Sequence, residues 1–536
     1  MRVENPMEVR FMKEIKELKF EELSVKQKLG MIHSAVVPFY KEEQAEFVFE
    51  QIKNHALGAI WIPSNDPNTE RFLQRVKETA DYPILVMTDA ENGLGDYKIG
   101  LRNCVGRTYD EKNAYAFGKS VGVVAKELGF NVVGSPILDI DAEHGGSPRK
   151  YHSTKEWVAK MAAAEARGMR DAGLMAVGKH YPGARNDLPV DSHMAEALSL
   201  ETKEELMNEG LYVYKSLVDQ GLLDGIMTSH HKVEKIDPVY PASLSKKVID
   251  VIKDEGFDGF FITDAIDMMG VRAKFGAVDS KGLAVMAGND FVLTYSLNPI
   301  EDQKIIDECY EKGIITDERL DEAVKKVLAM QHKVLEMDKN RATSLTEDEI
   351  ERMKTVEKKA VCIKVDEGLT ASISRDGRHA FEVMIKYVMD PWGVDVDTFK
   401  SNWLFPDEIK KQILELFPNS RVHFVHQLPS PVQNLHALCH AQDYDDVVFF
   451  SFTDTLTYIG KDHFTSRIVA LLEAMQYTDR IAALVHFGNP TTLEALPHIP
   501  RYILGDTSVG SVKACLEVLA GEYEPEGKPT CEYTLN

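Results

Sequence analysis

The sequence lacks most features of secreted and membrane-embedded chains. Its six cysteines lie far apart and form no CxxC pair, which argues against a zinc framework or a disulfide scaffold and favours free thiols in a reducing compartment. No stretch approaches the roughly 20 apolar residues that a membrane helix needs. The N-terminal segment MRVENPMEVRFMKEIKEL is charged throughout and has no apolar core of a signal peptide. We therefore expect a soluble, cytoplasmic protein.

Positive charge is also scarce. The chain has 62 Lys and Arg against 85 Asp and Glu, a formal net charge of −23. Binding to nucleic acid or to an anionic membrane surface needs clustered Lys and Arg, so we expect neither as a partner. The C-terminal part has no GxGxxG motif and no Walker loop, and we expect no nucleotide or other cofactor.

The chain has 536 residues, too many for one compact core. In its N-terminal part, short apolar runs alternate with helical patterns, of which 157–173 and 203–221 are the clearest and both end at a glycine. Such near-continuous apolar runs suit parallel strands that are covered on both faces. Eight strand–helix units predict a (β/α)8 TIM barrel over residues 1–340. The expected strands lie at 29–35, 58–63, 84–89, 131–141, 174–180, 225–231, 259–265 and 290–295.

A second folding unit is expected after the barrel. A polar stretch suggests a linker at 341–355, and new strand and helix patterns then alternate to the end of the chain. They predict a smaller α/β sandwich domain over 356–536, with an open parallel or mixed sheet. Its expected strands are 380–387, 421–426, 446–452, 480–487 and 501–505, and its clearest helices are 406–417 and 465–477.

Polar residues gather where five of the barrel strands are expected to end. A TIM barrel has its active site at the carboxyl ends of the strands, so this coincidence is the main sign of an enzyme. These residues are Asp89 and Glu91, Asp139 and Asp141, Lys179 and His180, His230 and His231, and Asp264.

Two of these strand ends suggest roles in catalysis. Asp191 and His193 lie two residues apart in the loop KHYPGARNDLPVDSH (179–193), where a carboxylate could fix one imidazole nitrogen and leave the other to transfer a proton. Asp264 directly follows an apolar run and is placed to act as a nucleophile. The plainer interpretations are a loop histidine held by a nearby aspartate and, for Asp264 or Asp267, the N-cap of the next helix.

The combination resembles glycoside hydrolase family 3 and, within it, the β-N-acetylglucosaminidase (β-hexosaminidase) branch. The loop at 179–193 is similar to that branch's KHFPGHGDTxxDSH, and FITDAIDM (261–268) is similar to its strand-7 motif. MTSHHKVEKIDPVYPASLS (227–245) and AGNDFVL (287–293) also match family motifs, as does the segment 487–530. The resemblance runs from about residue 20 to residue 530.

The resemblance implies a retaining glycosidase that removes terminal β-linked N-acetylglucosamine, for example from a muropeptide or chitin fragment. It implies Asp264 as nucleophile and the Asp191–His193 pair as acid/base. It also implies that the sugar is bound by Asp89, Arg149, Lys179 and His180.

Three segments around the expected sugar pocket depart from the family. Tyr97 stands where the family has an arginine, Ala184-Arg185-Asn186 replaces a GHG with one residue added, and SPRKYH (147–152) replaces GDRSFG. A β-glycosidase of different sugar specificity therefore stays open. A histidine acid/base also leaves less negative charge to repel an anionic acceptor, so a glycoside phosphorylase stays open too.

Two other classes remain. A non-catalytic sugar-binding protein would need neither a nucleophile nor a proton donor. A metal-dependent hydrolase would need three or four converging ligands, yet no HxH ends the first strand, and consecutive His230 and His231 would point to opposite faces of a strand. The other candidate ligands for a metal are His180, His193, Asp89 and Asp264, and we expect no metal.

Overall fold

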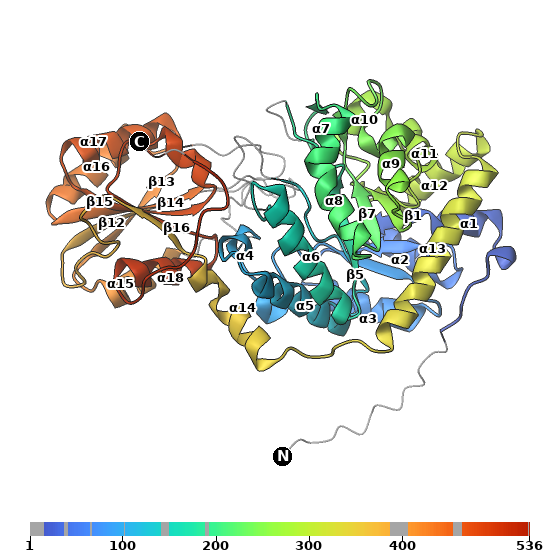
Figure 1. The fold of residues 1–536 in the computed structure, drawn as a ribbon, viewed down its shortest axis with the longest axis horizontal. Helices are drawn as coiled ribbons and strands as arrows, with labels where there is room; N and C mark the ends of the chain where they lie inside the picture. The colour runs from blue at the N-terminus through green and yellow to red at the C-terminus, as the bar shows by residue number, and fades with distance from the viewer. Residues whose placement is uncertain are drawn as a thin grey trace, which may run out of the picture.

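The computed structural model describes residues 15–36, 41–64, 67–100, 102–140, 149–187, 192–385, 406–453, 464–533 and 535. They form a parallel barrel, blue to yellow in Figure 1, and a second α/β domain beside it, orange to red. The predicted fold class, a TIM barrel followed by a smaller α/β domain, is confirmed. The boundaries predicted at residues 340 and 355 stay predictions.

The barrel is an eight-stranded parallel sheet that nearly closes on itself. A parallel bridge between Ile262 and Phe291 joins the last two strands, and β1 pairs with β10 across the seam. Nearly all of the strand residues are buried, which explains why each strand is encoded by an apolar run rather than by an alternating pattern. All eight expected strands are present: β1 (His33–Val36), β2 (Ala59–Trp61), β3 (Leu85–Thr88), β4 (Val132–Val133), β5 (Met175–Tyr181), β7 (Gly225–Thr228), β9 (Phe260–Thr263) and β10 (Val292–Thr294).

Helices cover the outside of the barrel. The helix expected over 203–221 is interrupted, and α7 (Lys203–Asn208) and α8 (Gly210–Asp219) replace it. Gly210 lies at the break because a Cβ there would come within 2.4 Å of the Gly183 carbonyl oxygen. The other barrel helices are α1 (Val25–Met31), α2 (Glu42–Lys53), α3 (Thr69–Thr79), α4 (Asn103–Arg107), α5 (Glu111–Leu128), α6 (Lys155–Asp171), α9 (Lys246–Asp254), α10 (Met269–Phe275), α11 (Ala277–Ala287), α12 (Pro299–Glu311) and α13 (Asp317–Asp338).

The second domain contains a six-stranded mixed sheet in the order β11-β16-β15-β14-β12-β13. The five expected strands are present, and an additional edge strand, β11, pairs antiparallel with β16. The strands are β11 (Cys362–Val365), β12 (His379–Ile385), β13 (Arg421–His426), β14 (Asp446–Thr453), β15 (Ile481–Gly488) and β16 (Arg501–Gly505). The helices that accompany them are α15 (Pro406–Leu416), α16 (Pro431–Gln442), α17 (Ser466–Tyr477) and α18 (Val509–Leu519).

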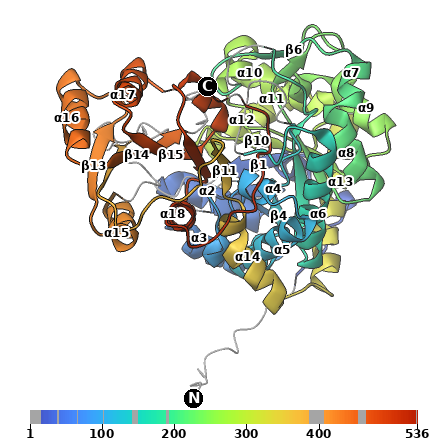
Figure 2. The same ribbon diagram turned by 60° about the vertical axis from the view of Figure 1, so that its left-hand side comes forward.

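Helix α14 (Glu347–Lys359) connects the two domains and lies along α5 (Figure 2). It begins inside the predicted linker, where Thr346 and Glu349 form a capping box. Glu349 also binds the buried Lys119 of α5, at 2.8 Å. Arg107 of α4 donates to the Gly505 carbonyl of β16 at 3.1 Å, so polar contacts tie the second domain to the barrel.

Among the described residues, no helix is both long and apolar enough to cross a membrane.

Candidate active site

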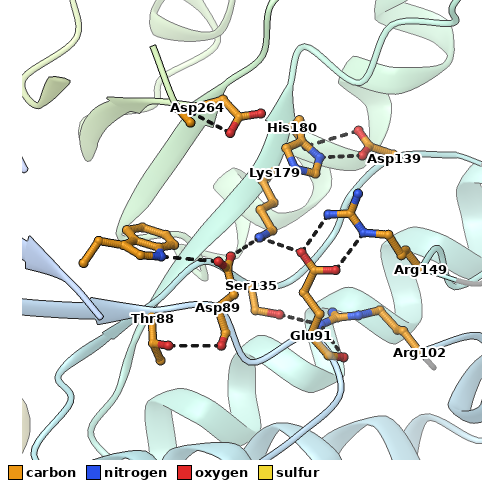
Figure 3. A network of polar contacts seen from close by, with 12 residues as sticks. Thr88, Asp89, Glu91, Arg102, Ser135, Asp139, Arg149, Lys179, His180 and Asp264 are labelled. Carbon is orange, nitrogen blue, oxygen red and sulfur yellow. Dashed lines mark hydrogen bonds and ion pairs between the residues drawn. The ribbon is translucent and has the colours of Figure 1, made fainter. Parts of the chain in front are cut away.

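The candidate functional side chains come from the carboxyl ends of three barrel strands. Asp89 follows β3, Lys179 and His180 lie near the end of β5, and Asp264 follows β9. Figure 3 shows them together: Lys179 extends toward Asp89, and the ring of His180 lies beside Asp139. Strand ends far apart in the sequence meet at one rim of the barrel, as the strand pattern predicted.

A network of ion pairs occupies one side of this rim. The Lys179 ammonium pairs with Asp89 and, at 2.8 Å, with Oε1 of Glu91. Arg149 makes a bidentate pair with Glu91, with Nε and Nη2 each 2.8 Å from a carboxylate oxygen. Lys179 is almost fully buried, whereas about half of the Asp89 side chain is exposed. Asp89 is therefore the member of the network that is most open to a ligand.

Burial and ion pairing shift the pKa values of these groups in opposite directions. Burial alone would raise the pKa of the Glu91 carboxyl, but Arg149 and Lys179 outweigh it and hold that pKa well below its ordinary value. For Lys179, burial would lower the pKa of the ammonium, but Asp89 and Glu91 raise it. Glu91, Lys179 and Arg149 therefore stay charged at neutral pH.

Asp89 is also held from the neighbouring strand. The indole Nε1 of Trp61, the last residue of β2, donates to Oδ2 of Asp89 at 3.3 Å. Gly134 provides the space for this contact, because a Cβ there would lie 2.9 Å from the Trp61 ring and 3.1 Å from Oδ1 of Asp89. The Asp89 carboxylate thus has few positions open to it.

His180 is oriented by Asp139. Its Nδ1 lies 2.8 Å from Oδ2 of Asp139, and its backbone N–H donates to Oδ1 at 3.1 Å. Burial would raise the pKa of the Asp139 carboxyl, but His180 holds it below its ordinary value, so the carboxylate stays charged. With Nδ1 engaged, the Nε2 side of the ring is the one available to a substrate.

Asp264 is partly buried at the mouth of the barrel. Its backbone N–H donates to the Thr228 carbonyl at 2.9 Å, and its Oδ1 accepts the N–H of Ala265 at 2.8 Å. Burial would raise the pKa of the carboxyl, but His180, His230 and His193 outweigh it and lower that pKa. Asp264 is therefore ionised at neutral pH, as a nucleophile must be.

The capping role considered for Asp264 and Asp267 is not what the structure has. Helix α10 begins after Met268, and no side chain caps it. Asp267 instead accepts the N–H of Tyr295 at 2.9 Å and pairs with Arg272 at 2.8 Å. Asp264, for its part, lies close enough to His180, His230 and His193 for them to lower the pKa of its carboxyl.

Of the expected acid/base pair, the structure describes His193, and Asp191 lies outside the described residues. His193 is half-buried and close enough to Asp264 to lower the pKa of its carboxyl. The chain after it forms β6 (Ala197–Ser199), which pairs with β8 (His231–Val233) in a small parallel sheet that the sequence did not predict. This sheet fixes one end of the loop to the barrel.

Some residues of the site were not assigned a role from the sequence. Glu91 and Asp139 were noticed as strand-end carboxylates, and in the structure they hold Arg149 and His180. Trp61 could have been found by the same signal, because it also ends a barrel strand. The fully buried pair of Arg102 and Glu165 had no such signal. Arg102 donates to the Glu91 carbonyl at 3.2 Å and so holds the backbone of Glu91 in place.

Tyr97, at the position where an arginine was expected, is not part of this network. It is half-buried and packs against the barrel core. Among the described residues, no three or more His, Cys, Asp or Glu side chains are arranged to hold a metal ion.

Residues 16–330 match the model of the glycosyl hydrolase family 3 N-terminal domain. The chain belongs to glycosyl hydrolase family 3. Its relatives include a β-hexosaminidase of Nitrosomonas eutropha, 29% identical over 228 residues, and one of Haemophilus influenzae, 28% identical over 271 residues. These matches cover 39% and 47% of this chain, and 64% and 76% of the two relatives' own lengths.

Solved structures share the whole two-domain fold of this family member. One is a family 3 β-N-acetylglucosaminidase from Paenibacillus sp. str. FPU-7, with a TM-score of 0.78, 22% identity, and coverage of 94% of this chain and 98% of that one. Another is a β-glucoside phosphorylase, also with a TM-score of 0.78, with 21% identity and coverage of 95% and 94%. At this identity the likeness concerns the fold.

Proposed function

We propose that this chain is a retaining glycosidase that releases terminal β-linked N-acetylglucosamine, with Asp264 as nucleophile and the Asp191–His193 pair as acid/base. The observation that carries the proposal is the convergence of the ionised Asp264 with His193 and His180 at one rim of the barrel. The names of the relatives, β-hexosaminidase and β-N-acetylglucosaminidase, support the choice of sugar.

The reaction would proceed in two steps. An Asp264 oxygen attacks the anomeric carbon and forms a glycosyl ester, while the glycosidic bond breaks and His193 gives a proton to the leaving oxygen. His193 then takes a proton from water, whose oxygen attacks the anomeric carbon and releases the carboxylate of Asp264. Oδ1 accepts the Ala265 N–H, so Oδ2 is the oxygen that attacks.

Sugar binding is assigned to the ion-pair network and to His180. Asp89, half exposed and fixed by Trp61 and Lys179, accepts hydrogen bonds from sugar hydroxyls. Glu91 forms ion pairs with both Lys179 and Arg149, so the two cations hold the shape and charge of the site. Their remaining N–H groups reach the sugar.

A phosphorylase is the second candidate, because a β-glucoside phosphorylase shares this fold and the proposed acid/base is a histidine. A panel of nitrophenyl glycosides, assayed with and without inorganic phosphate, tests both. We expect the β-N-acetylglucosaminide to be the fastest substrate and phosphate to have no effect. A β-glucoside that is tenfold faster, about 1.4 kcal/mol in transition-state binding, would overturn the sugar assignment. Formation of a sugar 1-phosphate would favour the phosphorylase.

A further inference from the structure

The loop that carries His193 is joined to the chain that follows Asp264 by a backbone hydrogen bond. The backbone N–H of Met269, the first residue of α10, donates to the His193 carbonyl at 3.2 Å. Only five positions separate Met269 from Asp264 along the chain. One short segment therefore connects the proposed nucleophile to the backbone of the proposed proton donor.

Gly270, the next residue, permits this contact. A Cβ on Gly270 would lie 2.5 Å from the Ala195 carbonyl oxygen and 2.6 Å from that of Ser192, whereas ordinary contact begins near 3.4 Å. Both oxygens belong to backbone and cannot turn aside as the end of a side chain can. Any residue larger than glycine would have to push the His193 loop away from α10.

Other contacts hold the same loop from its far side. β6 pairs with β8, and Glu196 binds Lys232 of β8 at 3.0 Å and Lys274 of α10 at 3.4 Å. These contacts fix where the loop returns to the barrel, but they lie three or more residues after His193. The N–H of Met269, by contrast, binds the backbone of His193 directly.

We propose that Met269 and Gly270, in the first turn of α10, are positioning residues that set the place of His193 relative to Asp264. The inference rests on the proposed function, in which His193 transfers protons to and from the sugar oxygen. Proton transfer depends on the distance between heavy atoms, and a displacement of about 1 Å can cost on the order of 10²-fold in rate.

Two substitutions test the two contacts separately. Met269→Pro removes the N–H that His193 accepts. The helix should tolerate it, because proline is favoured at the first helical position and Met268 already has the extended conformation (ψ 142°) that a residue before proline prefers. Met269→Ala is the matched control, since it removes the exposed side chain and keeps the N–H. Gly270→Ala introduces the Cβ that the loop cannot accommodate.

The readout is the dependence of the rate on the leaving group. We expect Met269→Pro and Gly270→Ala to lower kcat/KM about tenfold or more for a methoxyphenyl β-N-acetylglucosaminide, whose leaving group needs a proton. With a dinitrophenyl glycoside, which leaves unprotonated, the loss should be threefold or less. Azide, which attacks without a general base, should raise kcat of both variants on the dinitrophenyl substrate and leave Met269→Ala and the wild type unchanged.

An equal loss for both leaving groups, or no loss, in both variants would overturn the inference. Inactivity of the wild type on every glycoside would instead count against the proposed function. Hydrogen exchange then decides the inference independently: peptides containing Ser192–Ser199 should exchange faster in Met269→Pro than in Met269→Ala. Equal exchange in the two variants would contradict it.

Discussion

Glu91 and Arg149 form a bidentate ion pair, with two oxygen–nitrogen distances of 2.8 Å, at the rim of the barrel. The same carboxylate binds Lys179 on its other side. Glu91 therefore lies between two cations that were both expected to bind the sugar, and it neutralises part of their charge. The arrangement of charges at this rim therefore depends on Glu91 as much as on Lys179 and Arg149.

Replacing Glu91 by glutamine should weaken sugar binding and the fold together. The amide keeps the shape but leaves Arg149 without its anionic partner and Lys179 with Asp89 alone. Breaking a fully buried pair on one side costs about 3–5 kcal/mol, and we expect a smaller loss for this partly exposed pair. We expect KM to rise tenfold or more and the melting temperature to fall by several degrees. Glu322→Gln, at an exposed position, is the control. Wild-type KM and melting temperature in Glu91→Gln would show that the network has no such role.

Replacing Trp61 by phenylalanine should affect substrate binding more than stability. The ring still fills its place on β2, but Asp89 loses the N–H that it accepts at 3.3 Å. A hydrogen bond to a charged group contributes about 1.5–3 kcal/mol, so KM should rise roughly tenfold or more. Steady-state kinetics measures the change, and circular dichroism checks the fold. An unchanged KM would mean that Lys179 alone fixes Asp89.

The second domain should be more stable at acidic than at alkaline pH because of His379. Its Nδ1 faces Asp446 and its Nε2 faces the Ser374 carbonyl, two acceptors that require both nitrogens to carry protons. Burial alone would lower the pKa of His379, but Asp446 raises it above its ordinary value. The stabilisation is thus complete below about pH 6.5, the ordinary value, and is lost as the pH rises through the raised pKa.

The substitution His379→Gln isolates this effect. Glutamine cannot carry the charge, so the difference in melting temperature between wild type and variant should be largest at pH 5.5 and should shrink by pH 9. For a domain of this size, each 1 kcal/mol corresponds to about 2–4 °C. Thermal melts at both pH values measure it. A difference that stays constant or grows with pH would show that His379 is neutral in the fold.

The strands could be predicted because burial on both faces of the sheet requires a continuous apolar run in the sequence. The helix break at Glu209 and the edge strand β11 could not, because each depends on contacts made across the fold. Gly210 is required by the carbonyl of Gly183, and β11 is held by pairing with β16. Such partners, which lie far away along the chain, cannot be recognised from the local sequence.

The site was predicted unevenly for a similar reason. Asp89 and Asp264 follow strands, Lys179 and His180 lie near the end of one, and topology alone brings the four together. The role of Glu91 depends on Arg149, which comes from a different loop, and that of Asp139 depends on how His180 is turned. The sequence placed these carboxylates at the rim but could not say which side chain each would bind.

The most direct test of the account is to trap the covalent intermediate on Asp264. With a 5-fluoro-N-acetylglucosaminyl fluoride, the first step, formation of the glycosyl ester, should be faster than the second step, its hydrolysis. The ester should therefore accumulate on the protein. Mass spectrometry of the tryptic digest should find the added sugar on the peptide 254–272, and fragmentation should place it on Asp264. The label should be absent from Asp264→Asn, which should also lose turnover and keep its fold. A label on another carboxylate, or continued turnover by Asp264→Asn, would contradict the account.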